Sequence, residues 1–381
     1  MLRVNARTTI GVWLLLFVFL TPSATLGFST QAKQAFLYDF QTGHVLLEKN
    51  ADTPMPPASM SKIMSAYLVF EEIKSGRLSM DDEILISENA WRKGGSKMFV
   101  KVNDRVKVRD ILRGIIVQSG NDAAIAIAEH LEGSEAAFAE KMTSKARRLG
   151  LRNAKFKNAT GWPDPEHRIT ARELAKLAKL TIQNFPNLYS IYAETNFTYN
   201  GIKQGNRNPL LYSGFGADGL KTGRTRAAGY GLTASVQRAG RRLILVINGL
   251  KSSRRRKNEA KQLIEWGFRE FENYKFYEAG ESVTSIDVWL GTHQKVEAAV
   301  EDDILLTLRR SDKDKIKISL AFEEPIAAPI KKGQTIGLLK IKSPDEAAKE
   351  YPLLASKDVE RLGPFRRILA AINYLIWGAS D

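Results

Sequence analysis

The feature of this sequence that most constrains its fold is a change of hydrophobic period near residue 275. Before that point, apolar residues recur at helical spacing over 108–131 and 258–271, and two hairpins are predicted at 33–49 and 230–250. After that point come short apolar strands separated by Gly, Asp and Pro, at 283–290, 296–300, 304–308, 316–322 and 335–341. We therefore expect a domain that mixes helices and strands, followed by a small all-β domain.

Composition supports an ordinary globular protein of two domains. The chain has 381 residues, of which 44% are hydrophobic and 26% are charged, which argues against disorder and against a polytopic membrane protein. It has no cysteine, so disulfides, thiol catalysis, iron–sulfur clusters and Cys-ligated zinc are excluded. Its four histidines are scattered, without a His-Glu-x-x-His pair, so we expect no metal and no cofactor.

The amino terminus has the pattern of a secretory signal peptide. Arg3 and Arg7 precede an apolar run at 10–20, and small residues follow it. The alternative is an uncleaved membrane anchor, but the run has only about 11 residues and a span needs roughly 20. We therefore expect residues 1–27 to be a signal peptide that is cleaved within 24–32, and the mature protein to be exported.

Two common nucleotide-binding patterns are matched in sequence but lack the secondary structure that these sites require. The stretch 214–219 matches G-x-G-x-x-G, and with Lys221 it nearly spells a P-loop. Both sites need a helix after the glycines, whereas a strand is predicted here.

The net charge of +15 could indicate nucleic-acid binding. An exported chain without a nucleic-acid module points instead to anionic envelope surfaces, so we expect no nucleic-acid partner.

Three short motifs together indicate a catalytic site. S-x-x-K lies at 59–62, at the start of a predicted helix; S-x-N lies at 119–121, in a turn between helices; and K-T-G lies at 221–223, where a strand is expected to open. Each motif alone is common and could be a capping serine or a surface lysine. All three in this order, on these elements, form a strong signal.

The chemistry explains the spacing of the first motif. Residues i and i+3 of a helix share a face, so Lys62 can reach the hydroxyl of Ser59. A serine hydroxyl needs a base to become a nucleophile, and a desolvated lysine with a lowered pKa can take that role where no His–Asp pair is present. The start of a helix also offers unpaired N–H groups that suit a developing oxyanion.

The strings around these motifs carry a family resemblance. S-x-x-K, S-x-N and K-T-G resemble the penicillin-binding protein and serine β-lactamase superfamily. The longer strings at 56–62, 118–123 and 218–223 are similar to those of low-molecular-mass D-alanyl-D-alanine carboxypeptidases, and similarity runs from about residue 33 to the C-terminus, including Trp266-Gly267-Phe268. The resemblance implies an α+β fold in which helices cover an antiparallel sheet, then a small all-β domain and a C-terminal amphipathic helix.

The resemblance also implies catalytic roles. Ser59 would be the acylated nucleophile and Lys62 its base. Ser119 and Asn121 would relay protons and hold the substrate amide.

The same resemblance implies how the substrate's terminal carboxylate is held. Lys221 and Thr222 would contact it, assisted by Arg256. The oxyanion would lie between the backbone N–H of Ser59 and that of the residue after Gly223. That residue is Arg224, where close relatives often have His, and its side chain adds a cation at the mouth of the cleft.

Several nearby residues keep two interpretations. The segment 206–208 resembles a family segment beside the site, and it could equally be a capped surface loop. His167 is expected to order its loop rather than to transfer protons. The run 254–257 would ordinarily be a solvated helix start, and only Arg256 within it is expected to be functional.

The expected activity is removal of the terminal D-alanine from peptidoglycan stem peptides that end in D-Ala-D-Ala, with acylation by β-lactams. A β-lactamase is the main alternative, but no Glu-x-x-Leu-Asn segment lies between the second and third motifs, and the extra domain is foreign to that class. A DD-endopeptidase acting on cross-links and a non-catalytic penicillin-binding sensor or scaffold are further alternatives.

The C-terminal segment 364–377 reads as an amphipathic helix. Its length of about 21 Å is too short to span a hydrocarbon core of about 30 Å. The alternative is a helix that docks on the β-domain, but the resemblance favours a membrane anchor. We therefore expect a catalytic domain at 28–274, a β-rich domain at 275–356 and an anchor at 357–381, in the periplasm and attached to the outer face of the cytoplasmic membrane.

Overall fold

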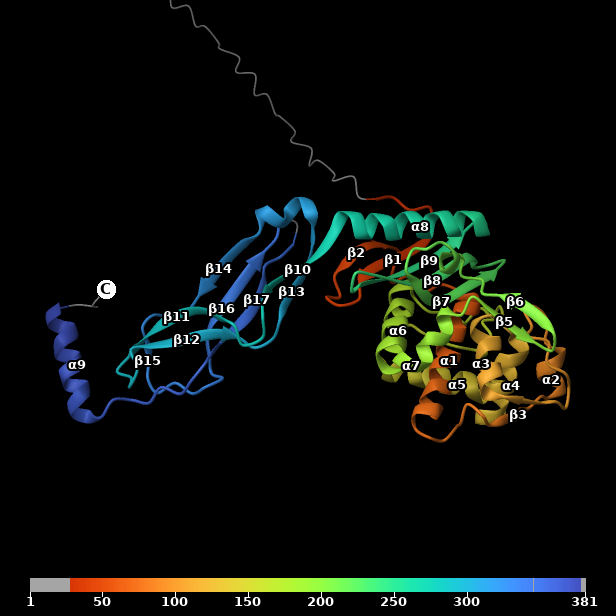
Figure 1. The fold of residues 1–381 in the computed structure, drawn as a ribbon, viewed down its shortest axis with the longest axis horizontal. Helices are drawn as coiled ribbons and strands as arrows, with labels where there is room; N and C mark the ends of the chain where they lie inside the picture. Colours follow the sequence, from red (N-terminus) through yellow and green to blue (C-terminus); the bar gives the residue numbers. More distant parts are fainter. Residues whose placement is uncertain (1–27, 345, 378–381) are drawn as a thin grey trace, which may run out of the picture.

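The computed structural model describes residues 28–344 and 346–377, so the predicted signal peptide lies outside the described residues. The chain forms two bodies (Figure 1), of which the first combines a five-stranded sheet and two short hairpins with most of the helices, and the second consists almost entirely of strands. This arrangement confirms the expected α+β fold with a small all-β domain after it.

The first body is built on an antiparallel sheet of five strands in the order β2-β1-β9-β8-β7. Its strands are β1 Gln34–Asp39, β2 Val45–Lys49, β7 Ala217–Thr225, β8 Gly229–Arg238 and β9 Arg241–Leu250. Both predicted hairpins are present, as β1–β2 and β8–β9. Strand β1 contributes Phe36 and Tyr38 to the core on one face of the sheet and Leu37 to the core on the other, as the alternation of side chains along a strand requires.

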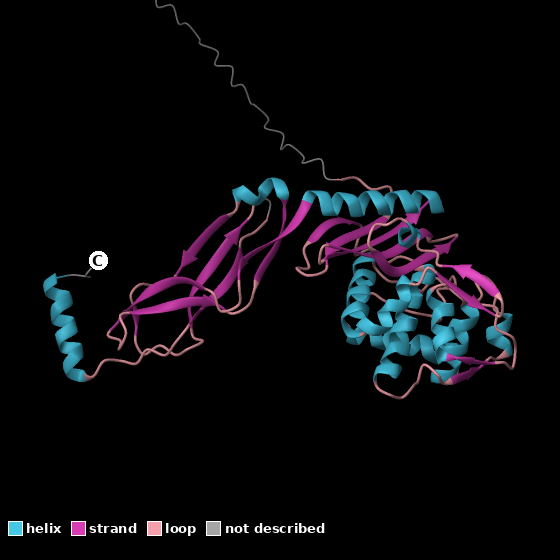
Figure 2. Ribbon diagram, in the orientation of Figure 1, coloured by secondary structure: helices cyan, strands magenta, loops and turns pink. Residues whose placement is uncertain are grey.

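Helices cover both faces of this sheet (Figure 2). The helix α8 lies along one face, and the helices of the other face form the larger layer. The bounds are α1 Lys62–Lys74, α2 Glu88–Arg92, α3 Val108–Ile116, α4 Asn121–Glu132, α5 Glu135–Arg148, α6 Ala171–Asn184, α7 Pro186–Tyr189 and α8 Ser253–Glu270.

Two helix starts show how the local sequence sets an element. Thr170 caps α6: its hydroxyl accepts from the N–H of Glu173 at 3.1 Å, and the Glu173 carboxylate accepts from the N–H of Thr170 at 3.2 Å. Helix α8 begins at Ser253, five residues before the predicted start at 258, because the hydroxyl of Ser252 accepts from the N–H of Arg255 at 3.1 Å.

Several short elements carry too little pattern for the sequence to predict them. Two small hairpins are formed by β3 Glu83–Leu85 with β4 Arg105–Lys107, and by β5 Asn196–Tyr199 with β6 Ile202–Gly205. The 3₁₀ turns are Ala58–Ser61, Ser190–Ala193, Pro209–Tyr212 and Arg310–Lys315.

The second body is all β, with one six-stranded sheet in the order β14-β16-β17-β12-β11-β15 and a two-stranded pair β10-β13. Its bounds are β10 Phe271–Tyr277, β11 Ser282–Trp289, β12 Lys295–Val300, β13 Ile304–Arg309, β14 Lys317–Ala321, β15 Ile326–Ala327, β16 Thr335–Lys342 and β17 Lys349–Ala355. The five predicted strands are present, whereas β10, β15 and β17 were not predicted.

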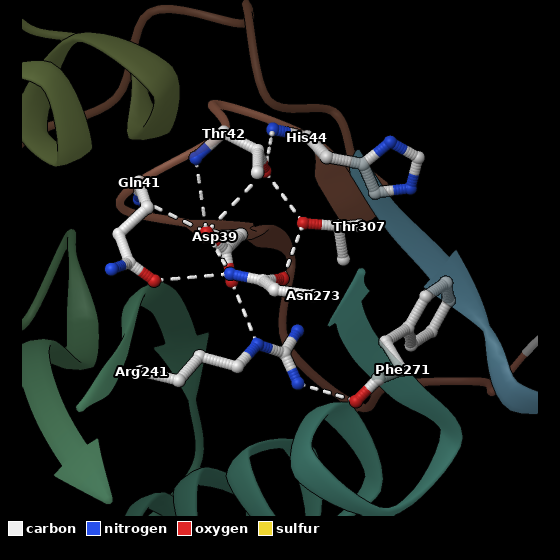
Figure 3. Close-up of polar contacts among 8 residues, drawn as sticks. All are labelled: Asp39, Gln41, Thr42, His44, Arg241, Phe271, Asn273 and Thr307. Atoms are coloured by element: carbon white, nitrogen blue, oxygen red, sulfur yellow. Dashed lines mark hydrogen bonds and ion pairs between the residues drawn. The ribbon is translucent and has the colours of Figure 1, made fainter. Parts of the chain in front are cut away.

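A polar cluster joins the two bodies (Figure 3). The buried carboxylate of Asp39 accepts from Arg241 Nε at 2.8 Å and from Asn273 Nδ2 at 3.2 Å. Thr307 Oγ1 donates to Asn273 Oδ1 at 2.7 Å and lies 2.6 Å from the Oγ1 of Thr42. The turn after β1 is therefore bonded directly to both β10 and β13.

The chain ends in the helix α9 Pro364–Trp377, at the predicted position. It lies beyond the strands of the second body (Figure 1). The large apolar side chains Phe365, Ile368, Leu369 and Ile372 are exposed. Over the described part of the chain, every helix is too short or too polar to cross a membrane.

Candidate active site

Ser59 lies in the 3₁₀ turn Ala58–Ser61, immediately before α1. The α-helix thus begins one tight turn later than predicted. The approach of the lysine is as predicted, because Lys62 Nζ lies 3.2 Å from Ser59 Oγ. Ala58 adopts a φ of +50°, which is unusual for a residue with a side chain. Gly161 packs against it so closely that an added Cβ would lie 1.9 Å from the Ala58 carbonyl oxygen.

Lys62 is a buried lysine with a full set of polar neighbours. Besides Ser59, its Nζ donates to Asn121 Oδ1 at 2.7 Å and to the carbonyl oxygen of Thr160 at 2.6 Å. Burial, aided by the positive charge of Arg207, lowers the pKa of Lys62 to about 7. A large fraction of this amine is therefore uncharged at neutral pH, and an uncharged amine can accept the proton of a serine hydroxyl.

The second motif is held rigidly beside this pair. Ser119 is buried, with a φ of +63° in the turn between α3 and α4, and Asn121 is the first residue of α4. The carboxylate of Asp122 accepts from the N–H groups of Met98 and Phe99 at 3.0 Å, which fixes a loop against the turn. This anchoring explains how a loop without a sequence signal contributes to the site.

The third motif lies within β7 rather than at its opening. The strand begins at Ala217, four residues before Lys221, so the predicted strand start was wrong. The edge of the sheet approaches the Ala58–Ser61 turn here, since a Cβ on Gly223 would lie 2.6 Å from the carbonyl oxygen of Pro57. Burial and the charge of Lys62 hold the pKa of Lys221 well below its usual range.

Two guanidinium groups share one aromatic ring at the mouth of the site. The carbon at the centre of the Arg224 guanidinium lies 5.1 Å from the Tyr230 ring centroid, and that of Arg256 lies 5.9 Å from it. Arg256 comes from the first turn of α8 and is buried, which lowers its pKa to about 10. Its Nε has no hydrogen-bond partner among the described residues.

The predicted residues converge on one pocket of about 440 Å³. It is lined by Ser59, Ser96, Ser119, Arg207, Thr222, Gly223, Arg224, Tyr230 and Arg256. Lys62 and Asn121 join it through the hydrogen bonds described above, and Lys221 is buried in the strand between Leu220 and Thr222. Hydroxyl groups and three arginines without a carboxylate in the lining suit a ligand that carries a negative charge.

Two lining residues, Ser96 and Tyr230, were missed by sequence reasoning. Ser96 accepts from Arg207 Nη1 at 2.5 Å, so the segment 206–208 does lie beside the site. Its asparagines hold the backbone, and Asn208 Nδ2 donates to the carbonyl oxygen of Gly219 at 2.7 Å. No pattern in the sequence marks Ser96 or Tyr230, because their position depends on tertiary contacts.

His167 is buried behind the turn that carries Ser59. Its Nδ1 accepts from the N–H of Lys157 at 3.2 Å, so its Nε2 carries the proton and donates to Ser61 Oγ at 2.7 Å. Ser61 in turn donates to the Ala58 carbonyl at 2.8 Å. Burial lowers the pKa of His167 to about 4. This chain of bonds orders the turn around Ser59, in line with the structural role expected for His167.

Metal-binding side chains do not gather in threes anywhere among residues that the structure describes. The pocket brings together serine, lysine, asparagine and arginine groups, which suit acyl transfer from an anionic substrate.

Comparison with known proteins agrees with this chemistry. Residues 21–252 match the model of the D-alanyl-D-alanine carboxypeptidase family, and residues 271–361 match that of the C-terminal domain of penicillin-binding protein 5. The chain is 37% identical to the D-alanyl-D-alanine carboxypeptidase DacC of Escherichia coli, over 89% of this chain and 87% of that protein.

Solved structures show the same similarity. Penicillin-binding protein 5 from Haemophilus influenzae superposes with a TM-score of 0.77 at 35% identity, covering 87% of this chain and 98% of that one. Penicillin-binding protein D2 from Listeria monocytogenes in its ampicillin-bound form superposes with a TM-score of 0.57 at 31% identity, covering 62% and 97%. The chain therefore belongs to the D-alanyl-D-alanine carboxypeptidase family, serine hydrolases of the penicillin-binding protein class.

Proposed function

We propose that Ser59 is the nucleophile through which this carboxypeptidase removes the terminal D-alanine of a peptidoglycan stem peptide. The observation that carries the proposal is the buried amine of Lys62, 3.2 Å from Ser59 Oγ and with a pKa of about 7. No other serine in the pocket has a lysine Nζ within hydrogen-bonding distance among the described residues.

The reaction follows from this geometry in two steps. Ser59 Oγ attacks the carbonyl carbon of the penultimate D-alanine while Lys62 accepts its proton, and the backbone N–H groups of Ser59 and Arg224 stabilise the oxyanion. Ser119 returns a proton to the leaving amine, and the side chain of Asn121 holds the substrate amide. D-Alanine leaves, and water then hydrolyses the ester on Ser59.

The terminal carboxylate has a separate set of partners in this proposal. Lys221, Thr222 and Arg256 would hold it, with the unpaired Nε of Arg256 as one available donor. A carboxylate at this point would also partly offset the cost of burying two positive charges in one pocket wall.

β-Lactams are proposed as inhibitors that use the same residues. Their strained amide and carboxylate imitate the D-Ala-D-Ala end, so Ser59 would open the ring and remain acylated. The ampicillin-bound form of the related Listeria protein supports this expectation.

Intact-mass analysis with a fluorescent penicillin, together with D-alanine release from a pentapeptide, tests the proposal. A long-lived adduct on Ser59 plus release of D-alanine is expected. Rapid loss of the adduct without D-alanine release would identify a β-lactamase, and a stable adduct without any release would identify a penicillin-binding sensor. Either result would overturn the proposal.

We also propose that the protein is exported by residues 1–27 and works in the periplasm, with α9 on the outer face of the cytoplasmic membrane. The exposed apolar side chains of α9 support this, since a helix docked on the β-domain would bury them. Truncation after Leu362 should release the mature enzyme from membranes while its activity on a small peptide is kept. A truncated enzyme that stays membrane-bound or unfolds would contradict the anchor.

The proposed units are a catalytic domain at 28–274, a β-rich domain at 275–356 and the anchor at 357–381. Strand β10, Phe271–Tyr277, crosses the first of these boundaries. A protein that ends after residue 274 should therefore lose β10's pairing with β13, and limited proteolysis of the full chain would test where the units separate.

A further inference from the structure

Tyr230 lies at the start of β8, where its half-buried side chain lines the active-site pocket. Across the strands it is paired with Arg224 of β7, and directly paired residues of neighbouring strands project from the same face of a sheet. The ring also packs against the apolar cluster that includes Leu263 and Ile264 of α8. Contacts with β7 and with this cluster therefore hold the ring in place.

The guanidinium of Arg256 lies beside this ring and has few other partners. Its central carbon is 5.9 Å from the ring centroid, within the range of a cation–π contact. Among the described residues, the Arg256 Nε has no hydrogen-bond partner, and Nη1 donates to the Gly231 carbonyl oxygen at 3.5 Å, which is a long hydrogen bond. The pocket lining offers no carboxylate to pair with it. The ring of Tyr230 is therefore the contact best placed to fix the direction of this guanidinium.

The backbone of α8 alone does not set that direction. It fixes the Cα of Arg256, since the N–H of this residue donates to the Ser252 carbonyl oxygen at 3.0 Å. The side chain beyond the Cα has several rotatable bonds, and ordering them when a substrate binds costs free energy. A guanidinium that already lies against a fixed ring has less freedom to lose, so it binds a carboxylate more tightly.

Arg224 shares the ring but differs from Arg256 in its exposure. Its guanidinium carbon lies 5.1 Å from the same centroid, and its side chain is exposed to solvent. Arg256 is only 8% exposed. A cation–π contact is stronger where water is excluded, so the loss of the ring should affect Arg256 more than Arg224.

We propose that Tyr230 is a positioning residue that holds Arg256 toward the terminal carboxylate of the substrate, an inference that rests on the proposed function. In this role the ring acts through Arg256 and makes no bond to the reacting atoms. The aromatic face provides the contact, so the phenol hydroxyl is not needed. A substrate without a terminal carboxylate gains nothing from the ring.

The test uses a peptide that ends in a free carboxylate and the C-terminal amide of the same peptide. The ratio of their kcat/KM values is the carboxylate preference of the enzyme. Tyr230→Leu and Tyr230→Met both remove the ring, so the test does not depend on one variant folding, and Tyr230→Phe keeps the ring. A loss of folded enzyme lowers both rates equally and cancels in the ratio, whereas a misplaced Arg256 changes the ratio.

The matched control is Phe215→Leu. Phe215 is also half-buried and also lies near two cations, since the Arg238 guanidinium carbon is 5.1 Å from its centroid and the Nζ of Lys261 on α8 is 4.7 Å from it. It lies outside the lining of the active-site pocket. This control therefore removes a comparable aromatic contact of α8 without touching Arg256.

The two ring-less variants should lower the carboxylate preference about tenfold, while Tyr230→Phe and Phe215→Leu should change it less than about twofold. In an Arg256→Ala background, removal of the ring should have no further effect on the preference, because the residue through which it acts is gone. An unchanged preference in the ring-less variants would overturn the inference. So would an equal loss in Tyr230→Phe or in Phe215→Leu, or a further loss in the Arg256→Ala background.

Failure of the proposed function gives a different result. A wild-type enzyme that releases no D-alanine from a pentapeptide would overturn the proposed function itself. A wild-type enzyme that releases D-alanine and prefers the free carboxylate, with the preference kept when the ring is removed, would overturn the role of Tyr230 alone.

Discussion

The Nζ atom of Lys62 lies 3.2 Å from the Oγ atom of Ser59, and the side chain of Lys62 is almost fully buried. Asn121 and the Thr160 carbonyl hold the amine from its other sides, so it cannot swing away from the hydroxyl without losing two hydrogen bonds. The contact between Ser59 and Lys62 is the basis of the first three predictions.

Ser59→Ala should abolish both penicillin labelling and D-alanine release, because no other serine that lines the pocket in the described structure has a lysine Nζ within hydrogen-bonding distance. Ser61 cannot substitute, since its Oγ is bonded to the Ala58 carbonyl and to His167. Intact-mass analysis after fluorescent penicillin provides the measurement. Labelling that persists in Ser59→Ala would remove Ser59 as the nucleophile.

Lys62→Arg should be nearly as damaging as Lys62→Ala. A guanidinium keeps the positive charge but stays protonated at any accessible pH, so it cannot act as a base. The acylation rate with penicillin is the quantity to compare. If Lys62→Arg kept a tenth of the wild-type rate, the base would have to be another group.

The acylation rate should rise with pH through a midpoint near 7, because the pKa of Lys62 is lowered to about 7 by burial. Below that value the amine is protonated and cannot accept the proton of Ser59, and above it the amine is free. The expected gain between pH 6 and pH 8 is about tenfold. Stopped-flow acylation at constant ionic strength would measure it, and a flat profile over this range would contradict the assignment of the base.

Arg256→Ala should impair release from a peptide that ends in a free carboxylate more than from its C-terminal amide. A charge-assisted hydrogen bond is worth roughly 1.5–3 kcal/mol, which corresponds to about one to two orders of magnitude in kcat/KM. The two substrates serve as controls for each other. Equal losses on both would leave Arg256 with a structural role only.

Asp39→Asn should lower the free energy of unfolding by about 3 kcal/mol, because Arg241 would keep its buried charge without the anion that it contacts at 2.8 Å. Asp287→Asn is the matched control. Asp287 pairs with Lys295 at an exposed position, and its loss should cost less than about 1 kcal/mol. Denaturant unfolding of both variants measures the difference, and equal effects would mean that the cluster adds little to stability.

The sequence predicted the approach of Lys62 to Ser59 because the spacing of the two residues is local. Ser59 and Lys62 lie three residues apart, and a single helical turn brings them together. Ser96 and Tyr230 could not be predicted in this way. Ser96 comes to the site through a loop held by Asp122, and Tyr230 does so through the register of β8 against β7.

The fold was predictable where the hydrophobic period was regular, as in the two hairpins of the first body. Strand β17 was missed because Pro352 lies inside it, and proline argues against a strand. Strand β10 was missed because it follows α8 at Phe271 without a turn residue to separate them. In both cases pairing with a distant strand decides the structure.

The direct continuation of α8 into β10 has a mechanical consequence. The helix is about 27 Å long, carries Arg256 in its first turn, and passes at its other end into the strand bonded to Asp39. It is a stiff connection between the second body and Arg256, the residue proposed to contact the substrate's carboxylate. A displacement of the second body would therefore be transmitted along this helix to Arg256, in the lining of the pocket.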